Sequence, residues 1–162
     1  MKARGLAINA LIAALYFVVT ATVAPFGFTM IQFRLSEAFN HLIVYNKRYF
    51  LGIVLGVFLS NLFLSPTKVD IVFGVGHTVV SLLITMYIAR FVKNKLILMG
   101  INTAIFSFNM FIIAYMLKVF AGAEEIFAFL WLILASEEFL TMGISILLIY
   151  FLNKRLHFEK IL

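Results

Sequence analysis

The sequence predicts an all-α, polytopic membrane protein of about six helices, folded as a single transmembrane domain over residues 1–162. Hydrophobic residues make up 64% of the chain and charged residues 12%, whereas soluble domains are near 45–50% apolar and about 25% charged. So large an apolar excess cannot be buried in a core of this size, and a bilayer must cover it. The apolar residues also fall into separate runs, and crossing ~30 Å of hydrocarbon takes roughly 20 helical residues.

Each apolar run ends at residues that interrupt a helix. Pro25 ends the first run and Pro66 closes the third, because proline cannot continue a helix. Turns that combine asparagine with lysine or arginine end the second, fourth and sixth runs. The second and third runs are short for a full crossing, so we expect them to be tilted or partly interfacial. The predicted helices span, in order, residues 5–24, 31–45, 49–64, 70–91, 96–117 and 125–152.

The basic residues predict the orientation of these helices. With six crossings, both termini and the second and fourth connections share one side of the membrane, and ten of the thirteen basic residues fall there. Arg34, Lys68 and Lys118 remain for the other side. Lysine and arginine accumulate on the cytoplasmic side, so we expect both termini to be cytoplasmic. The net charge of +6 is therefore an orientation signal, and we expect no nucleic-acid partner.

The sequence lacks the residues that several classes of function require. There is no cysteine, which excludes disulfides and cysteine-ligated metals. No phosphate-binding loop of the Gly-x-x-x-x-Gly-Lys type occurs, and the three histidines lie on different segments without zinc spacing. We therefore expect no catalytic residues, no metal and no cofactor. Cleavage of the first run as a signal peptide is the alternative to a first spanning helix, but the run is long for a signal core and five more runs follow.

Acidic residues at membrane depth are the first candidates for a binding site, since ionisable groups there are costly. Glu138 lies roughly 20 Å along the sixth predicted helix, near the middle of the bilayer, with Glu137 beside it. Trp131 is seven residues before Glu138 and shares its face. We therefore expect Glu138 and Trp131 to face a cavity and Glu137 to serve helix packing; a purely structural ion pair is the alternative. The remaining acids near helix ends, Glu124, Glu125 and Glu159, have a simpler interpretation as solvated charges.

Further polar side chains are expected in the outer half of the membrane. Asp70, Phe73 and His77 share one face of the fourth predicted helix. Each candidate also has a structural alternative: a helix cap for Asp70, a buried neutral imidazole for His77, interhelical hydrogen bonds for the asparagines and an interfacial ion pair for Arg34 and Glu37. Together they suit a flat, polar small molecule that is uncharged or cationic. The predicted binding residues are Gln32, Arg34, Glu37, Asn61, Asp70, Phe73, His77, Asn109, Trp131 and Glu138.

Small residues at helical spacing predict close helix contacts. Ala10 and Ala14 form a small-xxx-small pair in the first helix, and Gly52 and Gly56 form another in the third. Such faces let a second helix approach closely. For each pair, the neighbouring helix can belong either to this chain or to a partner subunit.

Several of these segments resemble the QueT family of predicted substrate-binding (S) components of energy-coupling factor (ECF) importers. Residues 31–38 resemble the family signature QFRxSEA, and they are the most specific match. Residues 60–66 resemble its NLFSP stretch and residues 70–74 its DxxFG stretch, while Phe108-Asn109 and Glu138-Phe139 are similar to its remaining polar positions. The chain has Glu137 where a glycine is expected, which would alter the charge preference for substrate.

The resemblance implies a function in uptake. An S component of this family would be a six-helix bundle in the bacterial cell membrane. It would capture a queuosine precursor, a 7-deazaguanine such as the aminomethyl or cyano precursor or queuine, from outside. Ala10 and Ala14 would dock onto a transmembrane scaffold subunit, and two separate ATPase subunits would use ATP. Alternatives are an S component for another vitamin, such as a pyrimidine or pyridoxine derivative, an intramembrane lipid-modifying enzyme, and a small structural or regulatory subunit.

Overall fold

A computed structural model describes residues 3–27 and 34–161 of the chain. The described residues form helices and connections, and no strand occurs among them. The helices are α1 (Ala3–Gly27), the 3-10 helices η1 (Leu35–Val44) and η2 (Lys47–Tyr49), α2 (Phe50–Leu64), α3 (Val69–Ile88), α4 (Lys95–Asn109), α5 (Phe111–Phe120), α6 (Phe127–Leu156) and α7 (Phe158–Ile161). The prediction of an all-helical protein is confirmed.

Within the described ranges, five segments are long and apolar enough to cross a membrane. They are Ala3–Val23, Lys47–Leu64, Val69–Ile88, Lys95–Phe120 and Phe127–Leu156. Many large apolar side chains on their outer faces are exposed, among them Leu11, Val72 and Ile144. An outward-facing apolar surface of this kind is what a helix presents to lipid. The segments therefore define a multi-pass membrane protein.

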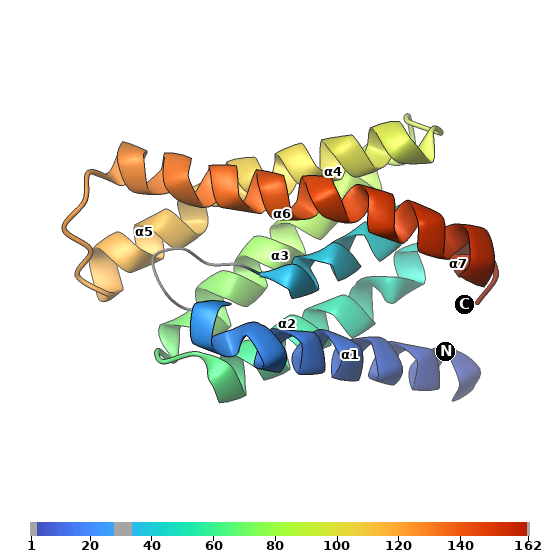
Figure 1. Ribbon diagram of the computed structural model, residues 1–162, viewed down its shortest axis with the longest axis horizontal. Coiled ribbons are helices and arrows are strands. Elements are labelled where there is room, and N and C mark those ends of the chain that lie inside the picture. Colours follow the sequence, from blue (N-terminus) through green and yellow to red (C-terminus); the bar gives the residue numbers. More distant parts are fainter. Residues whose placement is uncertain (1–2, 28–33, 162) are drawn as a thin grey trace.

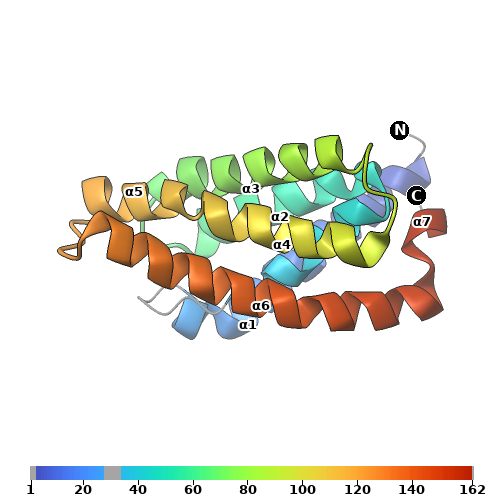
Figure 2. The ribbon, with the colours of Figure 1, turned by 90° about the horizontal axis from the view of Figure 1, so that it is seen from above.

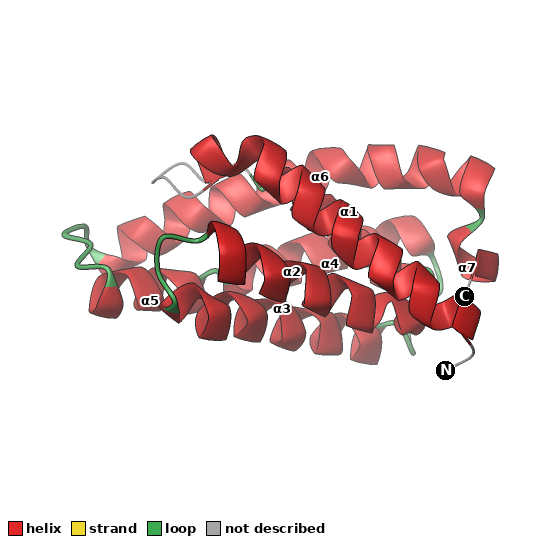
Figure 3. Ribbon diagram, turned by 90° about the horizontal axis from the view of Figure 1, so that it is seen from below, coloured by secondary structure: helices red, strands yellow, loops and turns green. Residues whose placement is uncertain are grey.

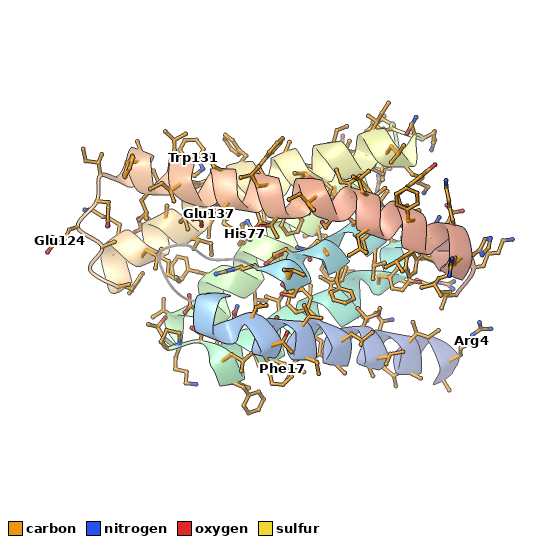
Figure 4. The ribbon with its side chains drawn as sticks, viewed as in Figure 1. Arg4, Phe17, His77, Glu124, Trp131 and Glu137 are labelled. Atoms are coloured by element: carbon orange, nitrogen blue, oxygen red, sulfur yellow. The ribbon has the colours of Figure 1, made fainter. Side chains whose placement is uncertain are left out.

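The two ends of the molecule differ in what they contain. Figure 1 shows both termini at one end, together with the α2 start and the α3–α4 connection. The α2–α3 and α5–α6 connections lie at the other end. We call these the terminal end and the loop end. Figure 4 places Arg4 at the terminal end and Glu124 at the loop end.

The second predicted helix differs most from its prediction. An α-helix over 31–45 was expected, but residues 34–45 contain the ten-residue 3-10 helix η1, and residues 31–33 lie outside the described ranges. At ~2.0 Å per residue, ten residues of 3-10 helix extend about 20 Å, against about 15 Å for an α-helix. Eight of the ten are buried, because η1 contacts α1, α2, α3, α4 and α6. In Figure 1 it lies at the centre of the bundle, between α6 and α2.

The fifth predicted helix is divided in two at Met110. The backbone N–H of Met110 donates to the Ser107 carbonyl, three residues earlier in the chain. Helix α5 then continues in a new direction (Figure 2). The remaining helices agree with their predicted ranges to within a few residues at each end. Helix α6 continues to Leu156 and is the longest, and His157 ends it in the left-handed conformation (φ 52°).

Glycine brings α1 and α2 into close contact (Figure 3). A Cβ on Gly56 would lie 2.6 Å from Tyr16 Cβ, and one on Gly52 would lie 2.8 Å from the Asn9 carbonyl oxygen. The Gly52 N–H also donates to Asn9 Oδ1 at 2.7 Å. The small-residue pair in α2 therefore serves packing within the chain.

Hydrogen bonds between buried groups connect η1 to α3, α4 and α6. His41 Nε2 donates to the Met142 carbonyl at 3.0 Å, and His41 Nδ1 accepts from Asn102 Nδ2 at 3.2 Å. Thr85 Oγ1 donates to Asn102 Oδ1 at 2.6 Å. These fully buried groups satisfy one another, as polar groups in an apolar interior must.

Candidate functional site

Six polar side chains from four elements lie in the interior and interact by hydrogen bonds or electrostatically. We call them the central polar cluster: Tyr16 of α1, Arg34, Glu37 and Asn40 at η1, His77 of α3 and Glu138 of α6. Five of the six side chains are at most 3% exposed, and Arg34 is 14% exposed. Figure 4 shows His77 in this interior region, between α6 and α1. Charged and polar groups this deep require partners or a polar ligand.

The 3-10 geometry of η1 aligns three members of the cluster. A 3-10 helix has three residues per turn, so side chains three apart eclipse one another. Arg34, Glu37 and Asn40 have this spacing. Arg34 Nη1 lies 3.9 Å from Glu37 Oε1, and Asn40 Nδ2 donates to Glu37 Oε2. Two successive turns, counted from Arg34 just before η1, thus present a cation, an anion and an amide on one face.

Glu37 is held on all sides by protein groups. Its Oε1 accepts from the Tyr16 hydroxyl at 3.1 Å and faces Arg34, while its Oε2 accepts from Asn40. A buried carboxylate with this many donors has most of its hydration replaced. Glu37 is therefore fixed in position.

Glu138 is held differently. Its carboxyl interacts electrostatically with both Glu37 and Arg34, so the two acids and the guanidinium share one electrostatic environment. Glu138 Oε1 is buried and has no hydrogen-bond partner among the described residues. An unpaired buried carboxylate oxygen costs several kcal/mol, which a donor on a bound ligand would recover.

His77 has one ring nitrogen satisfied and one not. Nε2 lies 3.0 Å from the Phe106 carbonyl oxygen, which can only accept, so Nε2 carries the proton in the neutral imidazole. Nδ1 is then an acceptor, and it has no partner within the described part of the chain. Arg34 is within electrostatic range of this ring. His77 thus adds a second acceptor to the cluster.

Asp70 and Asn61 form a separate group at the α2–α3 connection. Asp70 Oδ2 accepts from Thr67 Oγ1 at 2.7 Å and from Ser65 Oγ. Asn61 Nδ2 donates to the Asp70 carbonyl at 3.0 Å. This arrangement shapes the start of α3 at the loop end, and contact of either residue with a ligand stays a prediction.

Phe73, Trp131 and Asn109 also have partners away from the charged residues. Phe73 packs on the rings of Tyr115 and Phe120, at centroid distances of 6.3 and 5.5 Å. Trp131 Nε1 donates to the Phe108 carbonyl at 3.0 Å, and its ring packs on the apolar cluster of α5 and α6. Asn109 Nδ2 donates to Ser81 Oγ at 2.9 Å. Their roles in binding likewise stay predictions.

Gln32 and Glu137 are the last two residues that the sequence singled out. Gln32 lies outside the described residues. Glu137 is half-buried beside Glu138 on α6 (Figure 4), and adjacent side chains on an α-helix point about 100° apart. The two acids therefore face different surroundings, and the packing role of Glu137 stays a prediction.

Tyr16 and Asn40 were not among the predicted binding residues. The sequence does contain a signal for each. A tyrosine hydroxyl in the middle of a membrane helix needs a buried partner, and Asn40 continues the three-residue spacing of Arg34 and Glu37.

The outer face of α1 and α2 carries an apolar groove of about 450 Å³. Ala10 lines it with Leu6 and Asn9 of α1, and α2 contributes Leu51 and Phe58. Ala10 and Ala14 are both exposed, whereas the neighbouring Ala13 is buried against Gly56. The alanine pair is therefore available to another helix or to lipid.

Five segments of the described chain are apolar enough to cross a membrane, and together with the buried, charged cluster they define a multi-pass membrane protein with an internal polar site. The QueT transporter family model matches residues 6–154, and the chain belongs to this family. It is similar to the "Queuosine precursor transporter QueT" of Lactococcus lactis subsp. cremoris (strain MG1363), with 34% identity over 160 residues that cover 93% of each chain. The family comprises transporters rather than enzymes. No solved structure matches the chain.

Proposed function

We propose that this protein is the S component of an ECF importer and that it captures a queuosine precursor from outside the cell. Its family and the name of its Lactococcus relative support the substrate class. The central polar cluster is the observation that carries the proposal, because it gathers two acids, a guanidinium and an imidazole between helices in the membrane interior. Partner subunits would supply the ATP hydrolysis.

The cluster suits a 7-deazaguanine in its donors and acceptors. The ring N–H and the 2-amino group of a guanine-type base are adjacent donors that one carboxylate accepts side by side. Its carbonyl accepts from a guanidinium or amide. Glu138 and Arg34 supply these two kinds of group, and Glu37 has its oxygens occupied by Tyr16 and Asn40. We therefore assign the base edge to Glu138.

Titration of the purified protein with 7-deazaguanines tests the proposal. Thiamine, riboflavin and pyridoxal are the controls, and we expect deazaguanines to bind with dissociation constants well below tens of micromolar. Absence of such binding to every deazaguanine, or tighter binding of a control vitamin, would contradict the substrate assignment.

The proposed orientation places both termini and the terminal end in the cytoplasm, with six crossings if η1 is counted as one of them. The loop end would then face outward and give access to the cluster. The bias of lysine and arginine toward the terminal end supports this orientation.

Cysteine labelling tests the orientation without background, since the chain has no native cysteine. Glu124 lies at the loop end and Lys93 in the α3–α4 connection, and both are exposed. In intact cells, we expect a membrane-impermeant maleimide to label a Glu124→Cys variant and to leave a Lys93→Cys variant unlabelled until the cells are permeabilised. The reverse pattern would invert the orientation.

The exposed alanine pair on α1 is the proposed docking face for the scaffold subunit. Small residues permit close helix contact in a bilayer, where apolar burial alone gives little driving force. The apolar groove beside Ala10 continues this surface onto α2.

We expect the double variant Ala10→Leu/Ala14→Leu to lose copurification of its partner subunits and to bind ligand as the native protein does. Leucine would hold the helices apart, while the central polar cluster would remain untouched. An Ala104→Leu variant on the exposed face of α4 is the matched control. Full retention of the partners by the double variant would place the docking face elsewhere.

A further inference from the structure

Three buried polar atoms of the central polar cluster have no hydrogen-bond partner in the described ranges. They are Glu138 Oε1, His77 Nδ1 and Asn40 Oδ1. Their side chains are 2%, 1% and 0% exposed, so bulk water does not reach them from the surface. Asn40 bonds to Glu37, and Arg34 interacts electrostatically with both Glu138 and His77.

All three atoms are acceptors. A carboxylate oxygen only accepts, and His77 Nδ1 accepts because Nε2 donates to the Phe106 carbonyl. Asn40 donates through Nδ2 to Glu37, which leaves Oδ1 as its acceptor. A ligand that satisfies this cluster must therefore bring several donors, and a further acceptor on the ligand would face like groups.

The unpaired acceptors set the preference of the cluster. A donor on the ligand recovers the free energy lost at His77 Nδ1 and Asn40 Oδ1, whereas an acceptor in the same place leaves both atoms unpaired.

We propose that the cluster selects donor-rich deazaguanines, so that the 7-aminomethyl precursor binds in preference to the 7-cyano precursor. This inference rests on the proposed function. The base uses its ring N–H and amino group for Glu138. The ammonium group then offers three further donors to the remaining acceptors, His77 Nδ1 and Asn40 Oδ1. A nitrile in that place offers an acceptor lone pair and no proton.

Titration of the native protein in detergent or nanodiscs with 7-aminomethyl-, 7-methyl- and 7-cyano-7-deazaguanine separates the possible results. We expect affinity to fall in that order, with the aminomethyl compound bound at least tenfold more tightly than the cyano compound. The methyl compound is the matched control, since it fills the space with neither donor nor charge. Equal affinities, or tighter binding of the cyano compound, would overturn the inference and leave the proposed function standing. No binding of any of the three would instead remove the proposed function.

Two variants of His77 test the acceptor assignment. We expect His77→Leu, which removes Nδ1, to lower the ratio of aminomethyl to methyl affinity. His77→Asn, whose amide oxygen can replace Nδ1, should restore part of that ratio. A His77→Leu protein that binds with the native ratio would contradict the assignment.

Discussion

Glu138→Gln is expected to weaken binding of a deazaguanine by at least tenfold, which is about 1.4 kcal/mol. The amide keeps the shape of the carboxylate but replaces one acceptor oxygen by an NH₂ donor, which would oppose the donors of the base. Leaving a buried donor without its partner costs about 1–3 kcal/mol, and more where a charge is lost. Isothermal titration or quenching of the single tryptophan, Trp131, measures the affinity.

The same substitution should leave the ligand-free protein as stable as before or make it more stable. Glu138 is 2% exposed and its Oε1 is unpaired, so burying this acid destabilises the empty protein. Burying a neutral amide costs less free energy than burying a carboxylate. Opposite changes in affinity and in thermal midpoint distinguish a binding group from a structural one.

The control for this experiment is Glu124→Gln, which removes one negative charge from an exposed position at the loop end. We expect both its affinity and its thermal midpoint to match those of the native protein. If Glu138→Gln bound ligand with native affinity, the base edge would have to be recognised by another group, and the assignment of Glu138 would be wrong.

The sequence was sufficient to predict the helical class and the approximate span of most helices, because the length of an apolar run and the residues that end it are local properties. Depth along a helix is also local, and the acid at mid-membrane depth in α6, Glu138, is one of the buried residues of the central polar cluster. Arg34 and Glu37 were predicted as a pair one turn apart, and in the structure Arg34 Nη1 lies 3.9 Å from Glu37 Oε1.

What could not be predicted depends on which face of each helix meets which neighbour. An α-helix turns about 100° per residue and a 3-10 helix about 120°, so the two differ by about 120° over the six residues from Arg34 to Asn40. An α-helix was expected over 31–45, and the alignment of Asn40 with Arg34 and Glu37 in η1 was missed for that reason. Asp70 and His77 share a face of α3, yet the hydrogen bonds that Asp70 accepts from the Ser65 and Thr67 side chains depend on how the α2–α3 connection folds.

Gly56→Ala should damage both the fold and the site, although Gly56 is not in the central polar cluster. The new Cβ would lie 2.6 Å from Tyr16 Cβ and 2.9 Å from Tyr16 Cγ. Both atoms are close to the α1 backbone, so the clash can be relieved only by moving the helices apart or by rotating the Tyr16 side chain. Overpacking of this kind typically costs about 1–3 kcal/mol.

Moving Tyr16 would break its hydrogen bond to Glu37, whose Oε1 faces Arg34. Glu37 would then lose a fixed donor while staying buried, and the face of η1 that holds the cluster would lose its support. We therefore expect Gly56→Ala to lower the thermal midpoint and to weaken ligand binding together. Thermal unfolding followed by tryptophan fluorescence, with titration below the midpoint, measures both effects.

Gly143→Ala is the matched control, because a Cβ at Gly143 on α6 meets nothing within 4 Å. Alanine is the better helix former by roughly 1 kcal/mol, so this variant should be as stable as the native protein or slightly more stable. If Gly56→Ala behaved like Gly143→Ala, the contact between α1 and α2 would be loose enough to accept a methyl group. The close approach of these helices would then not be what positions Tyr16 against Glu37, and the support of the cluster would have to come from η1 alone.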